Sequence, residues 1–366
     1  MQAPETTRLT GAPRAAPSRL LLPLLFLASL TGRTHSQQTA VASAPAGSRP
    51  AYHVIKTLDV GGEGGWDYLV AEADPHRLFV SRSTHVMVVD LETGKVAGDI
   101  PDTAGVHGIA LAHDLGRGFT SNGRAATATI FDLKTLATIG TVKTGENPDA
   151  ILYDAPTKRV FTFNGRSGDT TVIDAAAGTV AGTIALGGKP EFAVSDGAGK
   201  IYVNIEDKSE VVTIDAQKLA VLSRWSIAPG EEPSGLALDG QQKRLFSACW
   251  NKTMVVLDCE SGKVLATPAI GDGVDGAGFD AASGCAFASN GEGTLTVVHE
   301  DDRSTFTVLE NVPTARGART MTLDPKTHAV YLPSAQYGAA PEPKPGERPG
   351  RPPMVPGSFR ILVLAR

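Results

Sequence analysis

Short apolar runs alternate with polar turns along the chain from residue 52 onward, and residues 148–187 show the pattern most clearly. Four runs rich in β-branched and aromatic residues are separated there by turns rich in Gly, Asp and Thr. Runs of this length and composition are typical of β-strands. We therefore predict strands at 149–153, 159–163, 170–173 and 180–186.

The same four-strand unit recurs seven times. The residues that open its first strand are 40 to 44 positions apart: Trp66, Val106, Pro148, Pro190, Pro233, Val274 and Ala318. Such a period, with four strand signals in each unit, indicates a radial β architecture in which each sheet buries its faces against its neighbours. We expect an all-β fold, a seven-bladed β-propeller with four antiparallel strands per blade, over residues 52–366.

The seventh unit supplies only three strands, at 319–323, 328–332 and 359–364. Residues 53–60 (HVIKTLDV) have the pattern of the missing fourth strand. Pairing this N-terminal strand with the C-terminal blade would close the ring and remove an exposed sheet edge. We predict that closure.

An Asp ends the third strand in each of the first five units: Asp90, Asp132, Asp174, Asp215 and Asp258. The side chain of an Asp that precedes a Thr-Gly or Ala-Gly turn accepts hydrogen bonds from nearby backbone groups. Its recurrence at the same place therefore favours a folding role over a row of catalytic groups. The sixth unit has His299 instead.

Composition limits the classes of function. The chain has 34 basic and 39 acidic residues. Residues 1–36 contain four of the basic residues and one acidic residue, so the rest of the chain has a net charge of −8. That balance disfavours binding to nucleic-acid phosphates. Apolar runs after residue 30 are too short to span a membrane. We expect no nucleic-acid partner, no transmembrane span in the mature chain, and a monomer.

Residues 1–36 have the pattern of a secretory signal peptide. Arginines precede the apolar segment 20–30, and small residues at 34 and 36 precede Gln37. An uncleaved anchor is the alternative. Residues 37–51, rich in Ala, Ser and Pro, predict a flexible linker. We expect a periplasmic or secreted protein.

The repeat resembles a known family. Both PSGLALDGQQKRLFSACWNKTMVVLDCESGKVLATPAIG, from Pro233, and PDAILYDAPTKRVFTFN, from Pro148, are similar to the YVTN-repeat (YncE-like) β-propellers, and the resemblance covers essentially the whole mature chain. It implies the seven-bladed, WD40-like fold. Members include envelope and surface proteins with binding roles, while related rings serve as lactonases and redox-enzyme subunits, so the fold does not select a function.

One side chain per unit lies directly after each opening residue: Asp67, His107, Asp149, Glu191, Ser234, Asp275 and Arg319. In such propellers the loops that enter the first strands and those that join the second and third strands surround the channel mouth, where function is expected. The latter loops add Arg82, Asn122, Arg124, Asn164, Arg166, Trp250 and Asn290.

Three interpretations of this ring stay open. Its polar side chains line a water-filled channel and pair with one another, Arg319 with a neighbouring carboxylate. Alternatively, they bind a small or peptide-like ligand, with the Asn and Arg residues as donors and Trp66 or Trp250 as an apolar wall. In the third interpretation the carboxylates hold a hard cation such as calcium, which could activate water for lactone or ester hydrolysis.

We predict a binding or interaction module without a resident cofactor, and the alternative is a metal-dependent hydrolase. No nucleophile elbow, P-loop or HExxH motif is present in the sequence. The predicted binding residues are Asp67, His107, Asp149, Glu191, Asp275, Arg319, Asn122, Asn164, Arg166 and Trp250.

A proline-rich insertion at 335–357 interrupts the last unit. Its seven prolines between 341 and 356 predict an extended segment. It is either a spacer or a lid across the channel mouth, in which Tyr337, Arg348 and Arg351 meet a ligand.

Overall fold

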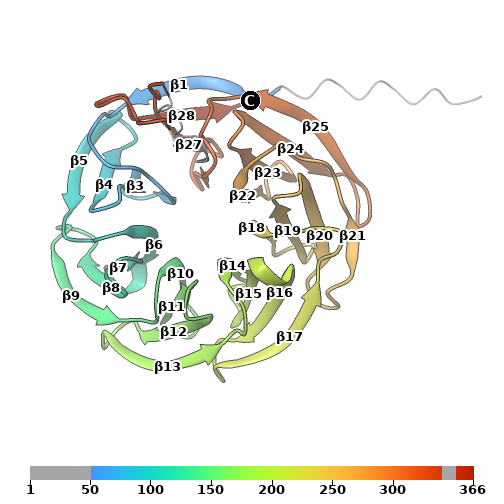
Figure 1. Cartoon of the computed structure of the whole chain (residues 1–366), viewed down its shortest axis with the longest axis horizontal. Helices are drawn as coiled ribbons and strands as arrows, with labels where there is room; N and C mark the ends of the chain where they lie inside the picture. The colour runs from blue at the N-terminus through green and yellow to red at the C-terminus, as the bar shows by residue number, and fades with distance from the viewer. Residues whose placement is uncertain (1–50, 340–351) are drawn as a thin grey trace, which may run out of the picture. The chain divides into compact units, whose positions relative to one another are not determined.

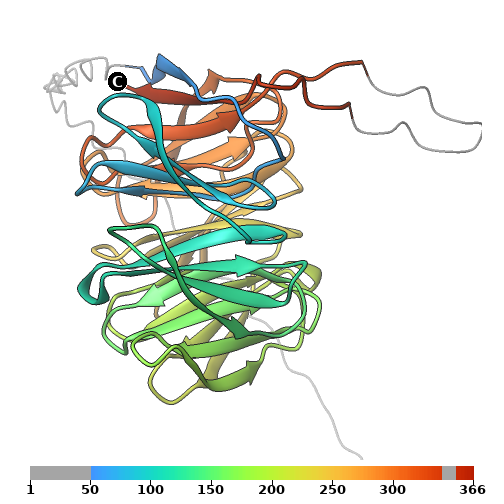
Figure 2. The same ribbon diagram turned by 90° about the vertical axis from the view of Figure 1, so that its left-hand side faces the viewer.

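Seven four-stranded antiparallel sheets form a closed ring, as the sequence repeat predicted (Figure 1). The computed structural model describes residues 51–339 and 352–366. We number the blades 1 to 7 in chain order, beginning with the blade that contains β2. Figure 2 shows the ring from the side as a disc of stacked sheets.

Within each blade the strands lie side by side from the axis to the rim. The innermost strands are β2 (Leu69–Glu72), β6 (Val106–Ala112), β10 (Pro148–Asp154), β14 (Pro190–Ser195), β18 (Pro233–Asp239), β22 (Val274–Asp280) and β26 (Thr322–Leu323). The second strands are β3 (Arg77–Ser81), β7 (Arg117–Asn122), β11 (Arg159–Asn164), β15 (Lys200–Ile205), β19 (Arg244–Cys249), β23 (Cys285–Asn290) and β27 (Val330–Ser334). The third strands are β4 (Val86–Asp90), β8 (Thr127–Asp132), β12 (Asp169–Asp174), β16 (Glu210–Asp215), β20 (Thr253–Asp258), β24 (Thr294–Glu300) and β28 (Arg360–Ala365). The outer strands are β5 (Lys95–Ile100), β9 (Thr138–Lys143), β13 (Thr179–Ala185), β17 (Ala220–Ser226), β21 (Val264–Ala266), β25 (Phe306–Pro313) and β1 (His53–Asp59).

The ring closes through the first strand of the described chain. β1 pairs antiparallel with β28, with Leu58 opposite Ile361, and so supplies the outer strand of blade 7. Leu58 is buried in the apolar cluster between blades 7 and 1. The predicted closure is confirmed.

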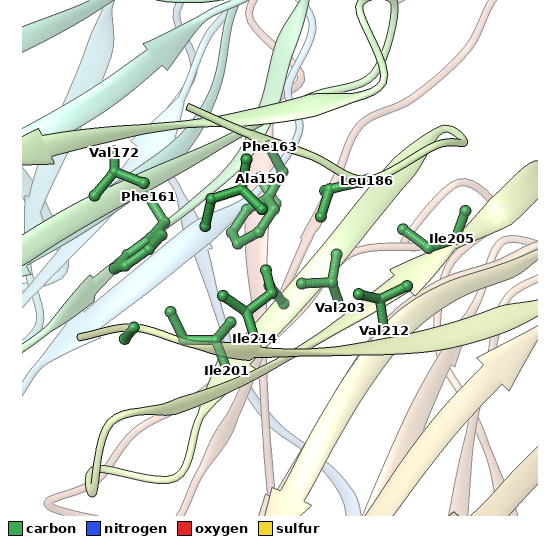
Figure 3. Close-up of a cluster of buried hydrophobic side chains, with 13 residues drawn as sticks. Ala150, Phe161, Phe163, Val172, Leu186, Ile201, Val203, Ile205, Val212 and Ile214 are labelled. Atoms are coloured by element: carbon green, nitrogen blue, oxygen red, sulfur yellow. The ribbon is translucent and has the colours of Figure 1, made fainter. Parts of the chain in front are cut away.

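The core lies between blades. The second and third strands are buried on both faces because each blade packs against two neighbours, which explains their continuous apolar runs. Between blades 3 and 4, for example, Phe161 and Phe163 meet Ile201 and Ile214 (Figure 3). Burial of each such side chain stabilises the fold by about 1.5–3 kcal/mol.

The recurrent third-strand Asp has the predicted turn role. Oδ1 of Asp174 accepts hydrogen bonds from the N–H groups of Ala176, at 3.0 Å, and Ala177, at 2.8 Å. Asp258 does the same for Glu260 and Ser261. These residues belong to the fold and lie away from the channel mouth.

Helical structure in the described ranges is confined to two short 3-10 turns, η1 (His113–Leu115) and η2 (Glu206–Lys208). No helix in these ranges is long and apolar enough to cross a membrane.

Candidate functional site

The ring side chains meet where the innermost strands begin. Five of these strands start with an irregular register, for example between Pro148 and Ile151 of β10, so the residue after the opening one leaves the regular ladder. Such bulges re-aim side chains. Glycine then lets neighbouring inner strands approach closely, because a Cβ on Gly235 would lie 2.5 Å from the backbone nitrogen of Ala277.

His107 sits between two carboxylates. Its Nδ1 donates a hydrogen bond to Oδ2 of Asp67 at 2.6 Å, and Oδ1 of Asp149 lies 3.6 Å from the same nitrogen. The three residues come from blades 1, 2 and 3, so this contact joins three neighbouring innermost segments.

Arg319 connects Asp275 to Asp67, and so to the contact between Asp67, His107 and Asp149. Its Nε donates to Oδ2 of Asp275 at 2.5 Å, and its Nη2 lies 3.6 Å from Oδ1 of Asp67. Ser234 donates to Oδ1 of Asp275 at 2.7 Å. The expected pairing of Arg319 with a neighbouring carboxylate is therefore confirmed.

Glu191 is not part of the contacts among Asp67, His107, Asp149, Asp275 and Arg319, and lies beside Lys189 instead. Lys189, in the loop before β14, places Nζ 3.2 Å from Oε2 of Glu191 and also pairs with Glu206. The Glu191 oxygen has no geometrically sound hydrogen bond despite this short distance. The contact is therefore an electrostatic contact of poor orientation rather than a full hydrogen bond.

Two carboxyl groups of the ring, those of Asp149 and Glu191, have pKa values raised above those of exposed carboxyl groups. Burial raises the pKa of Asp149 to about 7, against the opposing charge of His107. Burial, together with the charge of Asp149, raises the pKa of Glu191 to about 9. Burial disfavours charged His107, but the hydrogen bond to Asp67 and the charges of Asp149 and Asp67 outweigh it and raise its pKa to about 9. At neutral pH His107 is therefore an imidazolium and Glu191 is uncharged.

Aromatic rings lie behind the polar ring. Tyr68 and Phe192 are 5.0 Å apart between ring centroids, and the space around them is a void of about 50 Å³. Burial and the nearby carboxylates raise the pKa of Tyr68, so its hydroxyl stays protonated. Tyr68 was not among the predicted site residues, although it directly follows a ring residue and so points to the other side of the strand.

A hollow of about 490 Å³ opens at the mouth, over blades 7, 1, 2 and 3. Residues that line it include Trp66, Asp67, His107, Asn147, Arg319, Arg124 and Arg166. Arg124 and Arg166 are exposed and have no side-chain partner in the described part of the chain. They occupy equivalent places in Asn-Gly-Arg segments of neighbouring blades.

Glycine shapes the wall of this hollow. A Cβ on Gly123 would lie 2.7 Å from Nε2 of His107 and 3.0 Å from Oδ1 of Asn147. Only glycine therefore leaves room for the imidazole in its present position. Nε2 has no hydrogen-bond partner within residues 51–339 and 352–366, so a donor on His107 remains available.

Six of the ten predicted binding residues do not line the hollow: Asp149, Glu191, Asp275, Asn122, Asn164 and Trp250. Asn122 and Asn164 are buried, and their amides bond side chains of their own blades: Asn122 with Thr129 at 2.9 Å, Asn164 with Thr171 at 3.0 Å. They hold strand ends and have no donor left for a ligand. Trp250 is half-exposed in blade 5 and does not line the hollow. The predicted residues that do line it are Asp67, His107, Arg166 and Arg319.

Arg82 also has a structural role. Its guanidinium stacks 3.7 Å from the Phe359 ring centroid and donates to the carbonyl oxygens of Gly61 and Gly64. Burial lowers its pKa to about 10. Arg82 thus pins the glycine-rich turn that precedes blade 1.

The proline-rich insertion is described only at its two arms, 335–339 and 352–357. Backbone hydrogen bonds of 2.8 Å join these arms, which extend from one side of the disc (Figure 2). The Tyr337 ring lies 6.3 Å from that of Trp66, beside the hollow. The other expected lid contacts, Arg348 and Arg351, lie outside the described residues.

One group of ring residues could hold a metal ion. Asp67, His107 and Asp149 each offer a ligand atom within 4.8 Å of the others. A metal on Nδ1 of His107 would have to displace the proton that now bonds Asp67, which disfavours metal binding at low pH. Two carboxylates and one imidazole suit Zn²⁺ or a similar ion better than Ca²⁺.

Comparisons with known proteins identify the fold. No protein-family model and no curated protein sequence matches the chain. Among solved structures, Kuenenia stuttgartiensis hydrazine synthase matches 75% of this chain and 93% of its own at 17% identity, with a TM-score of 0.67. The structure of the RRP9 WD40 repeats matches 85% of this chain and 98% of its own at 12% identity, with a TM-score of 0.69. The structure of U3-55K matches 85% of this chain and 98% of its own at 11% identity, with a TM-score of 0.67. At these identities the likeness establishes a seven-bladed propeller with WD40-like neighbours, and no more.

Proposed function

We propose that this protein is an exported binding module whose ligand or partner site is the hollow at the channel mouth. The main support for this proposal is that Arg124 and Arg166 line a hollow of about 490 Å³ and have no side-chain partners in the described ranges. Two guanidinium groups left free at one concave site favour a ligand that supplies the missing negative charge. The WD40-like fold is consistent with an interaction role.

The chemistry of the hollow favours a small or peptide-like ligand with a carboxylate or phosphate group. That group would accept hydrogen bonds from Arg124, Arg166 and Nε2 of His107. Trp66 supplies an apolar wall, and Asp67 can accept a hydrogen bond from a donor on the ligand. Concave sites that combine one apolar wall with a few polar groups are typical of ligand recognition.

Export remains part of the proposal and rests on the leader pattern of residues 1–36, which lie outside the described residues. Mass spectrometry of protein from its native host tests it. The expected mature chain begins at Gln37. A periplasmic or secreted location would follow, while protein that retains residues 1–36 in the cytoplasm would contradict export. Membership of the YVTN-repeat (YncE-like) family is likewise proposed, on the repeats quoted above.

A thermal-shift screen tests the binding proposal. The full chain is heated with a panel of amino acids, dicarboxylates, sugar phosphates and acidic peptides. We expect at least one acidic compound to raise the Tm of the wild type, and the double variant Arg124→Gln/Arg166→Gln to lose that rise. Arg303→Gln, on the opposite face, is the matched control. A rise that survives loss of both mouth arginines would contradict the proposal.

One observation favours a second candidate, a metal-dependent hydrolase of lactones or esters. Asp67, His107 and Asp149 form a group that could hold a metal ion, and a bound metal ion lowers the pKa of coordinated water. Metal analysis and lactone turnover discriminate the two functions. A stoichiometric metal whose removal abolishes turnover, with the same loss in Asp149→Asn, would favour the hydrolase; a metal-free protein that binds acidic ligands would favour the binding module.

A further inference from the structure

Asn147 lies between the two arginine loops of the channel-mouth hollow. It belongs to the loop before β10, and its backbone oxygen accepts a hydrogen bond from the N–H of Gly165 at 2.9 Å. Its side chain reaches the neighbouring blade, because Oδ1 lies only 3.0 Å from the place of a Cβ on Gly123. Arg124 and Arg166 each follow one of these glycines. The two loops that carry the guanidinium groups therefore flank a single residue.

Backbone contacts hold both arginine loops in place. In blade 2 the N–H of Gly123 donates to the carbonyl oxygen of Gly105 at 2.8 Å, and a Cβ on Gly105 would lie 2.6 Å from the backbone nitrogen of Arg124. In blade 3 the N–H of Arg166 donates to the carbonyl oxygen of Glu146 at 3.2 Å. The backbone of each loop is thus fixed before a ligand arrives, which lowers the entropic cost of binding.

The charges that line the hollow do not balance. Asp67 is in contact with His107 and with Arg319, so these three groups have partners. Among the charged residues of the lining, Arg124 and Arg166 are the two without an acidic partner in the described ranges. A ligand that pairs with both must therefore bring two negative charges.

Hydrogen-bond donors also gather at this place. The side-chain amide of Asn147 has no partner within residues 51–339 and 352–366, and neither has Nε2 of His107. With the two planar guanidinium groups they offer donors to more acceptors than the two oxygens of one carboxylate. A phosphate monoester has three terminal oxygens and about 1.5–2 negative charges at pH 7. It therefore matches both the charge and the donors.

Trp66 provides the apolar side of the hollow. Its ring packs 5.3 Å from that of Phe359 and 6.3 Å from that of Tyr337, between centroids, so its position is fixed. Its Nε1 is buried, which leaves a flat surface without a donor for the ligand. The volume of about 490 Å³ is that of a site for a small molecule.

We propose that the ligand at the channel mouth is the phosphate monoester of a small organic molecule. Arg124, Arg166 and Asn147 bind the phosphate, and the organic part lies against Trp66. This inference rests on the proposed function, since it concerns the same hollow. It narrows the acidic group of the ligand to phosphate.

Titration calorimetry of the full chain at pH 7.5 tests the proposal with matched probes. Phenyl phosphate carries two charges on one group, benzoate and methyl phenyl phosphate carry one charge each, and phthalate carries two charges on separate groups. We expect phenyl phosphate to bind the wild type at least about 10-fold more tightly than each of the others, because it alone can satisfy both guanidinium groups through one group.

Two variants test the residues that bind the phosphate. Asn147→Asp keeps the shape of the side chain and suits the φ of 54° at this position, but it replaces a donor with a negative charge. It should weaken the binding of phenyl phosphate at least about 10-fold with little change in Tm. Arg124→Gln, in an exposed loop, should weaken it by a similar factor, while Arg303→Gln on the opposite face should bind as the wild type does.

The outcomes separate this inference from the proposed function. Benzoate or phthalate that binds as tightly as phenyl phosphate would overturn the phosphate assignment and leave the binding module intact. The absence of binding by any acidic compound would overturn both. An affinity for phenyl phosphate that is unchanged in Asn147→Asp and Arg124→Gln would also overturn the assignment. A phosphoserine peptide that binds at least about 10-fold more tightly than phenyl phosphate would overturn the small-molecule class.

Discussion

Nδ1 of His107 donates a hydrogen bond of 2.6 Å to Oδ2 of Asp67, across the boundary between blades 2 and 1. This contact fixes the imidazole in one orientation, with Nε2 toward the hollow wall at Gly123. It also keeps His107 charged at neutral pH. One hydrogen bond thus provides both a link between blades and a positive donor at the mouth.

The first prediction concerns the pH dependence of this link. Because the folded pKa of His107 is raised to about 9 from an ordinary 6.5, its stabilisation is complete below about pH 6.5 and is lost as the pH rises through 9. In urea unfolding at pH 6, the free energy of unfolding of the wild type should exceed that of His107→Gln by about 1–3 kcal/mol. That difference should nearly vanish at pH 9.5; a constant difference would show that the imidazolium is not involved.

The second prediction concerns Glu191. Its folded pKa is raised to about 9 from 4.5, so folding retains a proton that the unfolded chain loses, and stability falls as the pH rises from 4.5 to 9. Glu191→Gln cannot ionise. It should therefore be more stable than the wild type at pH 9 by about 1–3 kcal/mol, with the gap closing toward pH 4.5. Denaturant unfolding at several pH values measures this, and the exposed Glu63→Gln is the control that should show no gap.

The third prediction tests the pairing of Arg319 with Asp275. Asp275 is buried, so Arg319→Gln leaves a buried charge with only Ser234 as partner and should cost about 2–4 kcal/mol of unfolding free energy. Adding Asp275→Asn should recover part of that loss, because the buried charge is then gone. A double-mutant cycle measures the coupling. Strictly additive losses would mean that the two side chains do not stabilise each other.

Much of this architecture could be predicted because it repeats. A period that recurs seven times identifies the four strands of each blade, and β10 to β13 lie within two residues of their predicted bounds. Recurrence also separated the turn residue Asp174 from the variable ring residue Asp149. The closure strand β1 was predictable because blade 7 lacked one strand.

The binding donors were harder to predict because the sequence does not give burial. Asn122, Asn164 and Asn290 all end a second strand, and the recurrence argument that assigned the third-strand Asp to the fold applies equally to them. Their amides bond threonines of the next strand. Tyr68 carries no comparable signal, since its importance depends on which groups other blades bring near it.

The fourth prediction concerns ring closure. Deleting residues 52–60 removes β1, the outer strand of blade 7, and with it Leu58 from the apolar cluster between blades 7 and 1. The deletion should lower the Tm of the whole protein and increase aggregation, because it exposes the edge of β28. Calorimetry and light scattering measure both effects. A truncated chain with unchanged melting would contradict the closing role of β1.

The most direct test of the central claim is an isothermal titration of the acidic compound that gives the largest thermal shift. With the wild type we expect one site per chain. With Arg124→Gln/Arg166→Gln we expect an affinity at least about 100-fold weaker, because two charge-assisted hydrogen bonds are lost. Arg303→Gln should bind as the wild type does. Equal affinities for the wild type and the double variant would contradict a ligand site at the channel mouth.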